Sequence, residues 1–484
     1  MSLGVSLLIN NRDVAARGDA IFERRSPVTG EIATRAAAAS TDDADAAADA
    51  AAIALPAWAA LGPNARRALL LKAAEALEAR APDFVAAMAG ETGATAGWAG
   101  FNVYLAASML REAAALTTQV TGQVIPSDRP GCVAMSVRRP AGVVLGIAPW
   151  NAPVILGVRA IATPLACGNT VVLKASEMCP RTHRLIGDAL SDAGFPDGVC
   201  NVVTNAPADA AAVVAALVKH KAVRRVNFTG STKVGRIIAR LCAEELKPVL
   251  LELGGKAPLI VLDDADLDEA VAAAGFGAFM NSGQICMSTE RIVLVDAIAD
   301  AFAEKFVAKV RSLPAGDPRE AKAPLGSVVD PSAAKCINDL VADAVSKGAV
   351  LHQAADPKGT LLSAAVLDRV TPAMRIYAEE SFGPVTTIVR VADEEEAIRV
   401  ANDTEYGLTS AVFTRDTARG LRVAERIEAG MCHINGPTVH DEAQMPFGGT
   451  KASGYGRFGG QAGIAEFTEL RWITIDTQPG HYPI

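Results

Sequence analysis

The 484-residue chain has little that would tie it to a membrane or a nucleic acid. It has no run of about 18 apolar residues, so no segment is expected to span a bilayer. The start, MSLGVSLLINNRD, lacks the basic opening and long apolar stretch of a signal peptide. Lysines and arginines are scattered rather than clustered, which argues against nucleic-acid binding. The net charge of −8 is that of an ordinary soluble protein.

Metal-ligand spacing is also missing. No CxxC motif and no cysteine–histidine cluster occurs, and Cys432 and His433, adjacent on a predicted strand, would point to opposite faces. We therefore expect no metal, free thiols and a reducing cytoplasm. The eight cysteines are Cys132, Cys167, Cys179, Cys200, Cys242, Cys286, Cys336 and Cys432.

What is present is a strong alternation of strands and helices. Strand-like segments such as GVVLGIAP, NTVVLKAS, RRVNFTG and PVLLELGG are separated by helical stretches from residue 141 onward, and a second series starts after residue 255. Such alternation predicts parallel sheets covered on both faces. The predicted class is therefore α/β, with two tandem Rossmann-like open parallel-sheet domains. The length also favours two or three domains.

The remaining segments lead to predicted domain boundaries. Hairpin-like strands open the chain, STDDAD caps a helix over 40–60, and helices continue over 65–120. The tail FTELRWITIDTQP alternates like a strand and could pair with another chain or with 124–139. We predict one domain from 1–120 and 141–254, a second from 255–460, and a small β element from 121–140 and 461–484.

Two glycine-containing segments could hold a phosphate. GYGRFG at 454–459 matches a dinucleotide fingerprint in letters, but no predicted strand leads into it, so we regard it as a false match. VNFTGSTKVG offers a strand, a turn at Gly230 and a helix beginning near Ser231, where free N–H groups favour a pyrophosphate. A plain capped helix is the alternative. One strand earlier, Lys174 and Glu177 follow a strand end, either as ribose ligands or as a solvated pair.

Three further residues could carry chemistry. Cys286 lies in the loop NSGQICMSTER, where helical periodicity gives way to small polar residues, although most cysteines are inert and buried. Glu252 ends an apolar strand, so burial should raise its pKa towards that of a general base, unless it pairs with Lys256. Asn151 follows a strand in APWN and could stabilise an oxyanion or cap a helix.

Taken together, the segments PWN, LKASE, FTGSTKVG, LELGGKAP, NSGQIC, EESFGPV and MPFGGTKASGYGR resemble the aldehyde dehydrogenase superfamily over essentially the whole chain. The resemblance implies that Cys286 attacks an aldehyde to form a thiohemiacetal, that Asn151 and the Cys286 N–H hold the oxyanion, and that Glu252 activates water to hydrolyse the thioester. It also implies a homodimer or homotetramer assembled through the small β element.

The same resemblance implies NAD as cofactor, bound by the first domain, with the second domain carrying the nucleophile. Lys174 and Glu177 would hold the adenosine ribose, and the charge of Glu177 would repel a 2′-phosphate. The implied cofactor residues are Ile147, Trp150, Lys174, Glu177, Gly230, Ser231, Gly254, Glu380 and Phe382.

The substrate-lining segments resemble most those of bacterial salicylaldehyde and vanillin dehydrogenases, which implies an aromatic aldehyde as substrate. Arg159 stands where many relatives have an aromatic residue, so it either contacts a phenolic oxygen or is a surface residue with a neighbouring partner. The implied pocket residues are Trp98, Tyr104, Arg159, Ile285, Met287 and His440.

Other activities remain open from the sequence. Aliphatic aldehydes or semialdehydes could react by the same mechanism, whereas transfer to coenzyme A is disfavoured because Glu252 can activate water. A thiol hydrolase using Cys286, His440 and Asp441 is a more distant alternative. A purely binding role is disfavoured by the intact set of Cys286, Glu252 and Asn151.

Overall fold

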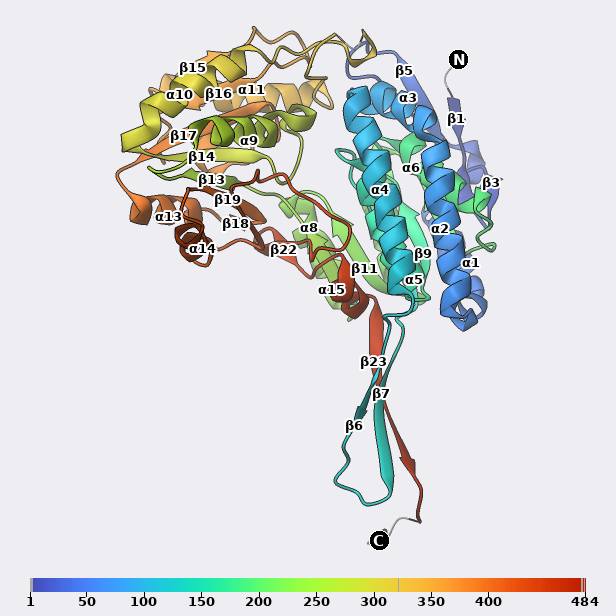
Figure 1. Cartoon of the computed structure of the whole chain (residues 1–484). Coiled ribbons are helices and arrows are strands. Elements are labelled where there is room, and N and C mark those ends of the chain that lie inside the picture. The colour runs from blue at the N-terminus through green and yellow to red at the C-terminus, as the bar shows by residue number, and fades with distance from the viewer. Residues whose placement is uncertain (1–2, 321, 480–481, 483) are drawn as a thin grey trace.

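The strands on either side of residue 255 form two separate open sheets in the computed structural model (Figure 1). The structure describes residues 3–320, 322–479, 482 and 484; residues 1, 2, 321, 480, 481 and 483 of the predicted domains lie outside this description. The predicted α/β class with two mainly parallel sheets and a small β element is confirmed.

The first sheet has the order β22-β12-β11-β8-β9-β10-β2-β3. Its five central strands are parallel, and β2, β3 and β22 are antiparallel additions at the two edges. The strands are β8 (Val143–Ile147), β9 (Thr170–Lys174), β10 (Cys200–Val203), β11 (Val223–Thr229), β12 (Val249–Glu252), β2 (Leu7–Ile9), β3 (Arg12–Val14) and β22 (Gly454–Tyr455).

Helices cover both faces of this sheet. The helix predicted over 40–60 begins with a capping box between Ser40 and Asp43, as the STDDAD sequence indicated. One face packs against α1 (Thr41–Ala60), α7 (Ala210–Lys219) and α8 (Thr232–Glu244). The other packs against α5 (Pro153–Ala166) and α6 (Pro180–Asp192), with α2 (Pro63–Ala79), α3 (Ala81–Thr92) and α4 (Ala96–Leu116) outside them.

The second sheet has the order β15-β16-β17-β14-β13-β19-β20 and is parallel except for β15. Its strands are β13 (Ala257–Val261), β14 (Thr289–Val295), β15 (Val350–Gln353), β16 (Ala365–Asp368), β17 (Val385–Val391), β19 (Thr409–Phe413) and β20 (Met431–Ile434). On one face lie α9 (Leu267–Phe279) and α10 (Asp296–Arg311); on the other lie α11 (Pro331–Ser346), α12 (Arg375–Ala378), α13 (Glu394–Asn402) and α14 (Thr417–Ala424).

A three-stranded antiparallel ribbon extends away from both sheets (Figure 1). It consists of β6 (Gln123–Ile125), β7 (Cys132–Pro140) and β23 (Thr468–Asp476), so the tail pairs with the segment near 124–139 within the same chain. The short helix α15 (Gly460–Glu466) leads into β23. Within the part of the chain described here, no helix is long and apolar enough to cross a bilayer.

Two smaller sheets complete the fold. β1 (Leu3–Val5), β4 (Ile21–Arg25) and β5 (Ile32–Ala37) form a separate sheet, and β18 (Tyr406–Gly407) pairs with β21 (Thr450–Lys451). The GYGRFG segment begins as β22 at the outer edge of the first sheet, where Gly454 has φ 105° and a Cβ would lie 2.0 Å from the Leu251 carbonyl oxygen. The glycine there serves close strand pairing.

Candidate active site

The parallel register brings several predicted site residues to one edge of the first sheet. Glu252 pairs with Thr229 at the last positions of β12 and β11, and Ile147 of β8 pairs with Lys174 of β9. The carboxyl ends of these strands therefore lie at the same edge, which is where open α/β sheets bind ligands.

Cys286 reaches this edge from the second sheet, on the loop before β14. A turn with left-handed backbone at Asn281 (φ 49°), Ser282 (φ 54°) and Gly283 (φ 72°) precedes it. Buried Gln284 fixes the loop by donating to the Ser327 carbonyl oxygen over 3.2 Å and accepting from the Val329 N–H over 2.9 Å. The strained turn is thus held by buried hydrogen bonds, as expected for a functional loop.

Asn151, which follows β8, is hydrogen-bonded to the loop that carries Cys286. Its side-chain Nδ2 donates to the Gln284 carbonyl oxygen over 3.0 Å, and its own carbonyl oxygen accepts from Trp98 Nε1 and Asn281 Nδ2, each over 2.9 Å. The side chain is buried and lines the same cavity as Cys286. The second N–H of this amide can therefore serve a ligand atom in the cavity.

Glu252 is a fully buried carboxylate, and within the described residues neither of its oxygens has a hydrogen-bond partner. Burial raises its pKa to about 7, an effect that the nearby Cys286 thiol and the positive charge of Arg159 partly offset. Lys256, the alternative partner, binds Glu290 instead over 2.7 Å. Glu252 is therefore available as a proton acceptor near neutral pH.

Two adjacent glycines allow this close convergence. A Cβ on Gly254 would lie 2.6 Å from Glu380 Oε2, and a Cβ on Gly255 would lie 2.4 Å from the Cys286 carbonyl oxygen. The Gly255 N–H also donates to Glu380 over 2.9 Å.

Burial raises the pKa of the Cys286 thiol well above its usual value, with neighbouring Glu252 adding to the rise, so the resting thiol is neutral.

A buried ion pair holds the loop that carries Glu380 and Phe382. Glu290 accepts hydrogen bonds from the Ser381 N–H (3.0 Å) and the Phe382 N–H (3.1 Å), as well as from Lys256. Phe382 has φ 48°, a left-handed conformation that is unfavourable for a large side chain. The pair thus stabilises a strained backbone beside the predicted cofactor residues.

Replacing Glu290 by Gln is expected to destabilise the protein strongly, because it leaves the Lys256 ammonium buried without a carboxylate. The expected loss is about 3 kcal/mol in the free energy of unfolding, measured by thermal denaturation. The matched control is Glu379→Gln, which breaks an exposed pair with Arg375 and should cost less than about 1 kcal/mol. Equal melting temperatures for the two variants would contradict this assignment.

The predicted cofactor residues cluster along the same edge. Glu177 is partly buried and binds Lys174 and Asn205, with the Asn205 Nδ2 at 2.9 Å. Ser231 caps α8, whose N-terminus follows the Gly230 turn, and the rings of Trp150 and Phe382 lie 5.6 Å apart in a T-shaped arrangement. An acceptor for ribose hydroxyls, a helix N-terminus for phosphates and a pair of aromatic rings fit a nicotinamide dinucleotide.

The cavity beside Cys286 has a volume of about 200 Å³ and a largely apolar wall. Four of the predicted wall residues, Trp98, Arg159, Ile285 and Met287, line it, together with Phe101, Leu156 and Phe447. Arg159 is buried, so the alternative of a surface arginine is wrong; it forms an ion pair with Asp441.

Tyr104 and His440 do not line this cavity, so their prediction as wall residues is wrong. Tyr104 is 64% exposed on α4. It falls off the face shared by Trp98, Phe101 and Leu105, which recur at helical spacing. His440 is exposed, binds Glu442 over 2.9 Å and stacks on His433.

The geometry also speaks against a thiol hydrolase. His440 turns to Glu442, and Asp441 is engaged by Arg159, so these two residues do not form a histidine–aspartate pair facing Cys286. A triad needs the base to contact the nucleophile and the carboxylate to orient the base. Neither requirement is met here.

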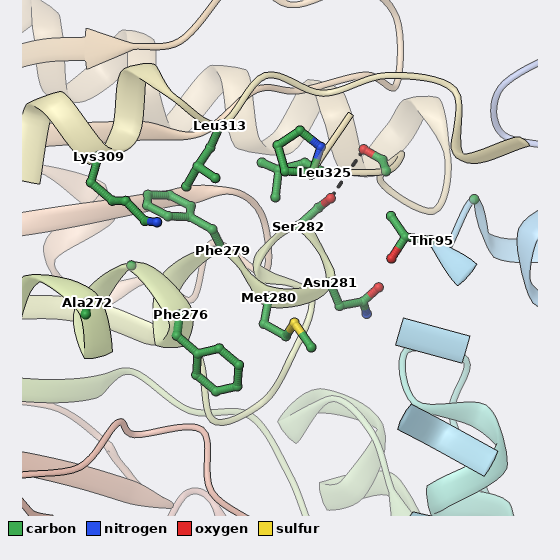
Figure 2. Close-up of a pocket in the computed structure, with 14 residues that line it drawn as sticks. Thr95, Ala272, Phe276, Phe279, Met280, Asn281, Ser282, Lys309, Leu313 and Leu325 are labelled. Atoms are coloured by element: carbon green, nitrogen blue, oxygen red, sulfur yellow. Dashed lines mark hydrogen bonds between the residues drawn. The ribbon is translucent and has the colours of Figure 1, made fainter. Parts of the chain in front are cut away.

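A second cavity of about 270 Å³ adjoins the first (Figure 2). It lies between α9, α10 and the turn at 280–283, and it shares Phe276 and Met280 with the cavity beside Cys286. Figure 2 shows these two side chains extending away from Phe279 and Leu313. Phe276 and Met280 therefore mark the boundary between the two spaces.

Several residues of the site were not singled out from the sequence. The sequence indicates Asp441 only as a member of the hydrolase triad, and it does not indicate roles for Gly255, Asn281, Glu290 and Phe447. For Gly255 a signal existed, because two consecutive glycines after a strand indicate close backbone approach. The partnership of Lys256 with Glu290 had no such signal.

Comparison with known proteins identifies the family. The sequence model of the aldehyde dehydrogenase family matches residues 14–473. The chain is 62% identical over 482 residues to a vanillin dehydrogenase of Pseudomonas fluorescens, with all of both chains covered. The chain belongs to the aldehyde dehydrogenase family.

Solved structures agree. A salicylaldehyde dehydrogenase from Pseudomonas putida G7, complexed with salicylaldehyde, superposes with a TM-score of 0.97 at 49% identity and full coverage of both chains. An NADP-dependent glyceraldehyde-3-phosphate dehydrogenase from Bacillus halodurans C-125 has a TM-score of 0.94 at 33% identity, covering 99% of this chain and 100% of its own. The family thus includes enzymes with different aldehydes and cofactors.

Proposed function

We propose that the protein oxidises aromatic aldehydes to carboxylic acids with NAD as the hydride acceptor. The observation that carries the proposal is the cavity of about 200 Å³ with Cys286 and Asn151 in an otherwise largely apolar wall. An engineered apolar cavity of about 150 Å³ is known to bind benzene, so this space suits a substituted benzene ring. The names of the vanillin and salicylaldehyde relatives support the same substrate class.

In this mechanism the chain's own residues perform the carbonyl chemistry. The Cys286 thiol loses its proton to solvent water, which leaves Glu252 ionised for the later step, and the thiolate forms a C–S bond to the carbonyl carbon. The carbonyl oxygen becomes an oxyanion, and donors from the Asn151 amide and the Cys286 backbone stabilise it. Bound NAD supplies an acceptor for the hydride that leaves the same carbon, after which a thioester remains on Cys286.

Glu252 then completes the turnover. Its carboxylate takes a proton from water, the hydroxide adds to the thioester carbon, and the C–S bond breaks to release the acid and the Cys286 thiolate. A base with a pKa of about 7 is about half ionised at neutral pH, so it can both accept and return this proton. Neither oxygen has a hydrogen-bond partner among the described residues, so each has lone pairs that can accept from a water molecule entering beside Cys286.

The choice of NAD over NADP rests on Glu177. Its carboxylate, bound to Lys174 and Asn205, would accept from a ribose 2′-hydroxyl and repel a 2′-phosphate. We expect kcat/KM to be at least about tenfold higher with NAD, which corresponds to about 1.4 kcal/mol of repulsion between Glu177 and a 2′-phosphate. Initial rates with both cofactors test this, and a preference for NADP would contradict it.

The same assay tests the substrate class. Benzaldehyde, hydroxylated benzaldehydes, short aliphatic aldehydes and succinic semialdehyde should be compared by NADH formation. Aromatic aldehydes are expected to show the highest kcat/KM because the wall is apolar. Higher values for an aliphatic aldehyde or the semialdehyde would overturn the aromatic assignment while leaving the chemistry at Cys286 intact.

Assembly and location are also proposals. We propose that the β6–β7–β23 ribbon bridges copies of the chain in a homodimer or homotetramer, which is supported by its exposed Val124, Leu470 and Trp472. Light scattering of the purified protein tests this, and a monomer would refute it. A cytoplasmic location is supported by eight unpaired cysteines and tested by cell fractionation.

A further inference from the structure

Beside the reacting groups, the wall of the catalytic cavity holds one other polar pair, Arg159 and Asp441. Arg159 comes from α5 and Asp441 from the loop after β20. Both side chains are more than nine-tenths buried, with 6% and 9% of their surfaces exposed. Burying an ion pair costs free energy unless hydrogen bonds satisfy its donor and acceptor atoms.

One acceptor atom of this pair has no hydrogen-bond partner among the described residues. Arg159 donates to Asp441 Oδ2, and its guanidinium carbon lies 4.1 Å from the centroid of the Phe447 ring. Asp441 Oδ1 is buried and has no hydrogen-bond partner among the described residues. A buried carboxylate oxygen without a donor is unfavourable, and a donor on a ligand would relieve this cost.

The position of the pair relates it to the chemistry. The charges of Arg159 and Asp441 both influence the pKa of Glu252, in opposite directions, which places the pair near the reaction centre. A ring held with its aldehyde carbon at Cys286 would thus lie in the same cavity as the unsatisfied oxygen. Arg159 fixes the position of the carboxylate through its hydrogen bond to Asp441 Oδ2.

We propose that Asp441 is a specificity residue whose Oδ1 accepts a hydrogen bond from a hydroxyl substituent on the aromatic ring of the substrate. The inference rests on the proposed function and deepens it, because it names hydroxylated benzaldehydes as the favoured class. It differs from recognition by Arg159: a carboxylate needs a donor on the ring, whereas a guanidinium needs only an acceptor.

Three substituents separate these possibilities. Hydroxyl can donate and accept, methoxy can only accept, and methyl matches hydroxyl in size without hydrogen bonding. The experiment measures kcat/KM for benzaldehyde and for its 2-, 3- and 4-substituted forms with each substituent, at a pH where the phenols are neutral. In the wild-type enzyme one hydroxy isomer is expected to exceed its methyl counterpart by about tenfold or more, with methoxy no better than methyl.

Asp441→Asn replaces the charged carboxylate with a neutral amide, whose oxygen is a weaker acceptor and whose NH2 group can only donate, and it is expected to reduce this hydroxyl-to-methyl ratio to below about threefold. The matched control is Glu442→Gln, the adjacent exposed carboxylate that binds His440 instead of facing the cavity, which should keep the wild-type ratio. An unchanged ratio in Asp441→Asn would overturn the proposal.

The wild-type measurement decides the question even if Asp441→Asn does not fold. No ring position with a hydroxyl preference, or equal rates for hydroxy and methoxy isomers, would refute recognition by Asp441. These failures are distinct from failure of the proposed function, in which benzaldehyde itself would not be oxidised.

Discussion

Cys286→Ala is expected to lower NADH formation by on the order of 10⁴-fold or more, because the described residues that line the cavity include no other thiol to form the thiohemiacetal. Binding of NAD should remain, since the predicted cofactor contacts come from the first sheet and the 380–382 loop. Steady-state rates measure the first effect, and fluorescence titration with NAD measures the second.

Cys336 supplies the matched control. It is an exposed thiol on α11, which packs on the second sheet, so Cys336→Ala removes a cysteine without affecting the cavity. Its activity should stay within about twofold of the wild type, as is usual for a surface substitution. An active Cys286→Ala enzyme would show that the nucleophile lies elsewhere.

Glu252→Gln is expected to form about one equivalent of NADH per active site rapidly and then stall. Glutamine cannot accept a proton from water, so hydrolysis of the thioester should fall by on the order of 10²-fold or more while acylation is affected less. Stopped-flow absorbance resolves the burst from the slow phase. Glu245→Gln at the exposed end of α8 is the control and should turn over normally.

The pH dependence gives an independent check on the same residue. Because burial raises the pKa of Glu252 to about 7, the wild-type deacylation rate should fall as the pH drops through about 7 and the carboxylate becomes protonated. The residual turnover of Glu252→Gln should lack this limb. Full steady-state turnover by the variant would rule out the assigned role of Glu252.

The melting temperature of Glu252→Gln distinguishes an enzyme that stalls at the thioester from one that has unfolded. A raised folded-state pKa makes the ionised carboxylate unfavourable for folding, an effect that develops between the unfolded pKa of about 4.3 and about 7. Above pH 7 it is fully present, so Glu252→Gln should melt no lower than the wild type at pH 8.

The sequence could predict that these site residues share one sheet edge, because each strand is recognisable from its own segment of the chain. Strand–helix alternation identifies parallel strands, and parallel strands place their carboxyl ends together. Asn151, Lys174, Ser231 and Glu252 each follow or end such a strand, so their proximity required no long-range information. The edge strand β15 and its neighbour β16 are not predicted from the sequence, because the four-residue segments VLHQ and AVLD carry little alternation.

Partnerships between distant segments could not be predicted in this way. Arg159 and Asp441 are 282 positions apart, and nothing in either neighbourhood specifies the other. The competing pairing of Lys256 with Glu252 was plausible from four-residue spacing, but the two lie on different sheets and Glu290 on neighbouring β14 is closer. For His440 the error is of the other kind, because a residue that the sequence places in the cavity wall lies outside it. Val439 and Asp441 line the cavity, while the His440 side chain between them points outward.

Mass spectrometry of Glu252→Gln after incubation with NAD and benzaldehyde tests most directly whether the thiol and the carboxylate act on one carbonyl carbon. The enzyme should gain the mass of one benzoyl group, and peptide mapping should locate that group on Cys286. An unmodified protein that has nevertheless produced NADH, or an acyl group on any other residue, would contradict the mechanism.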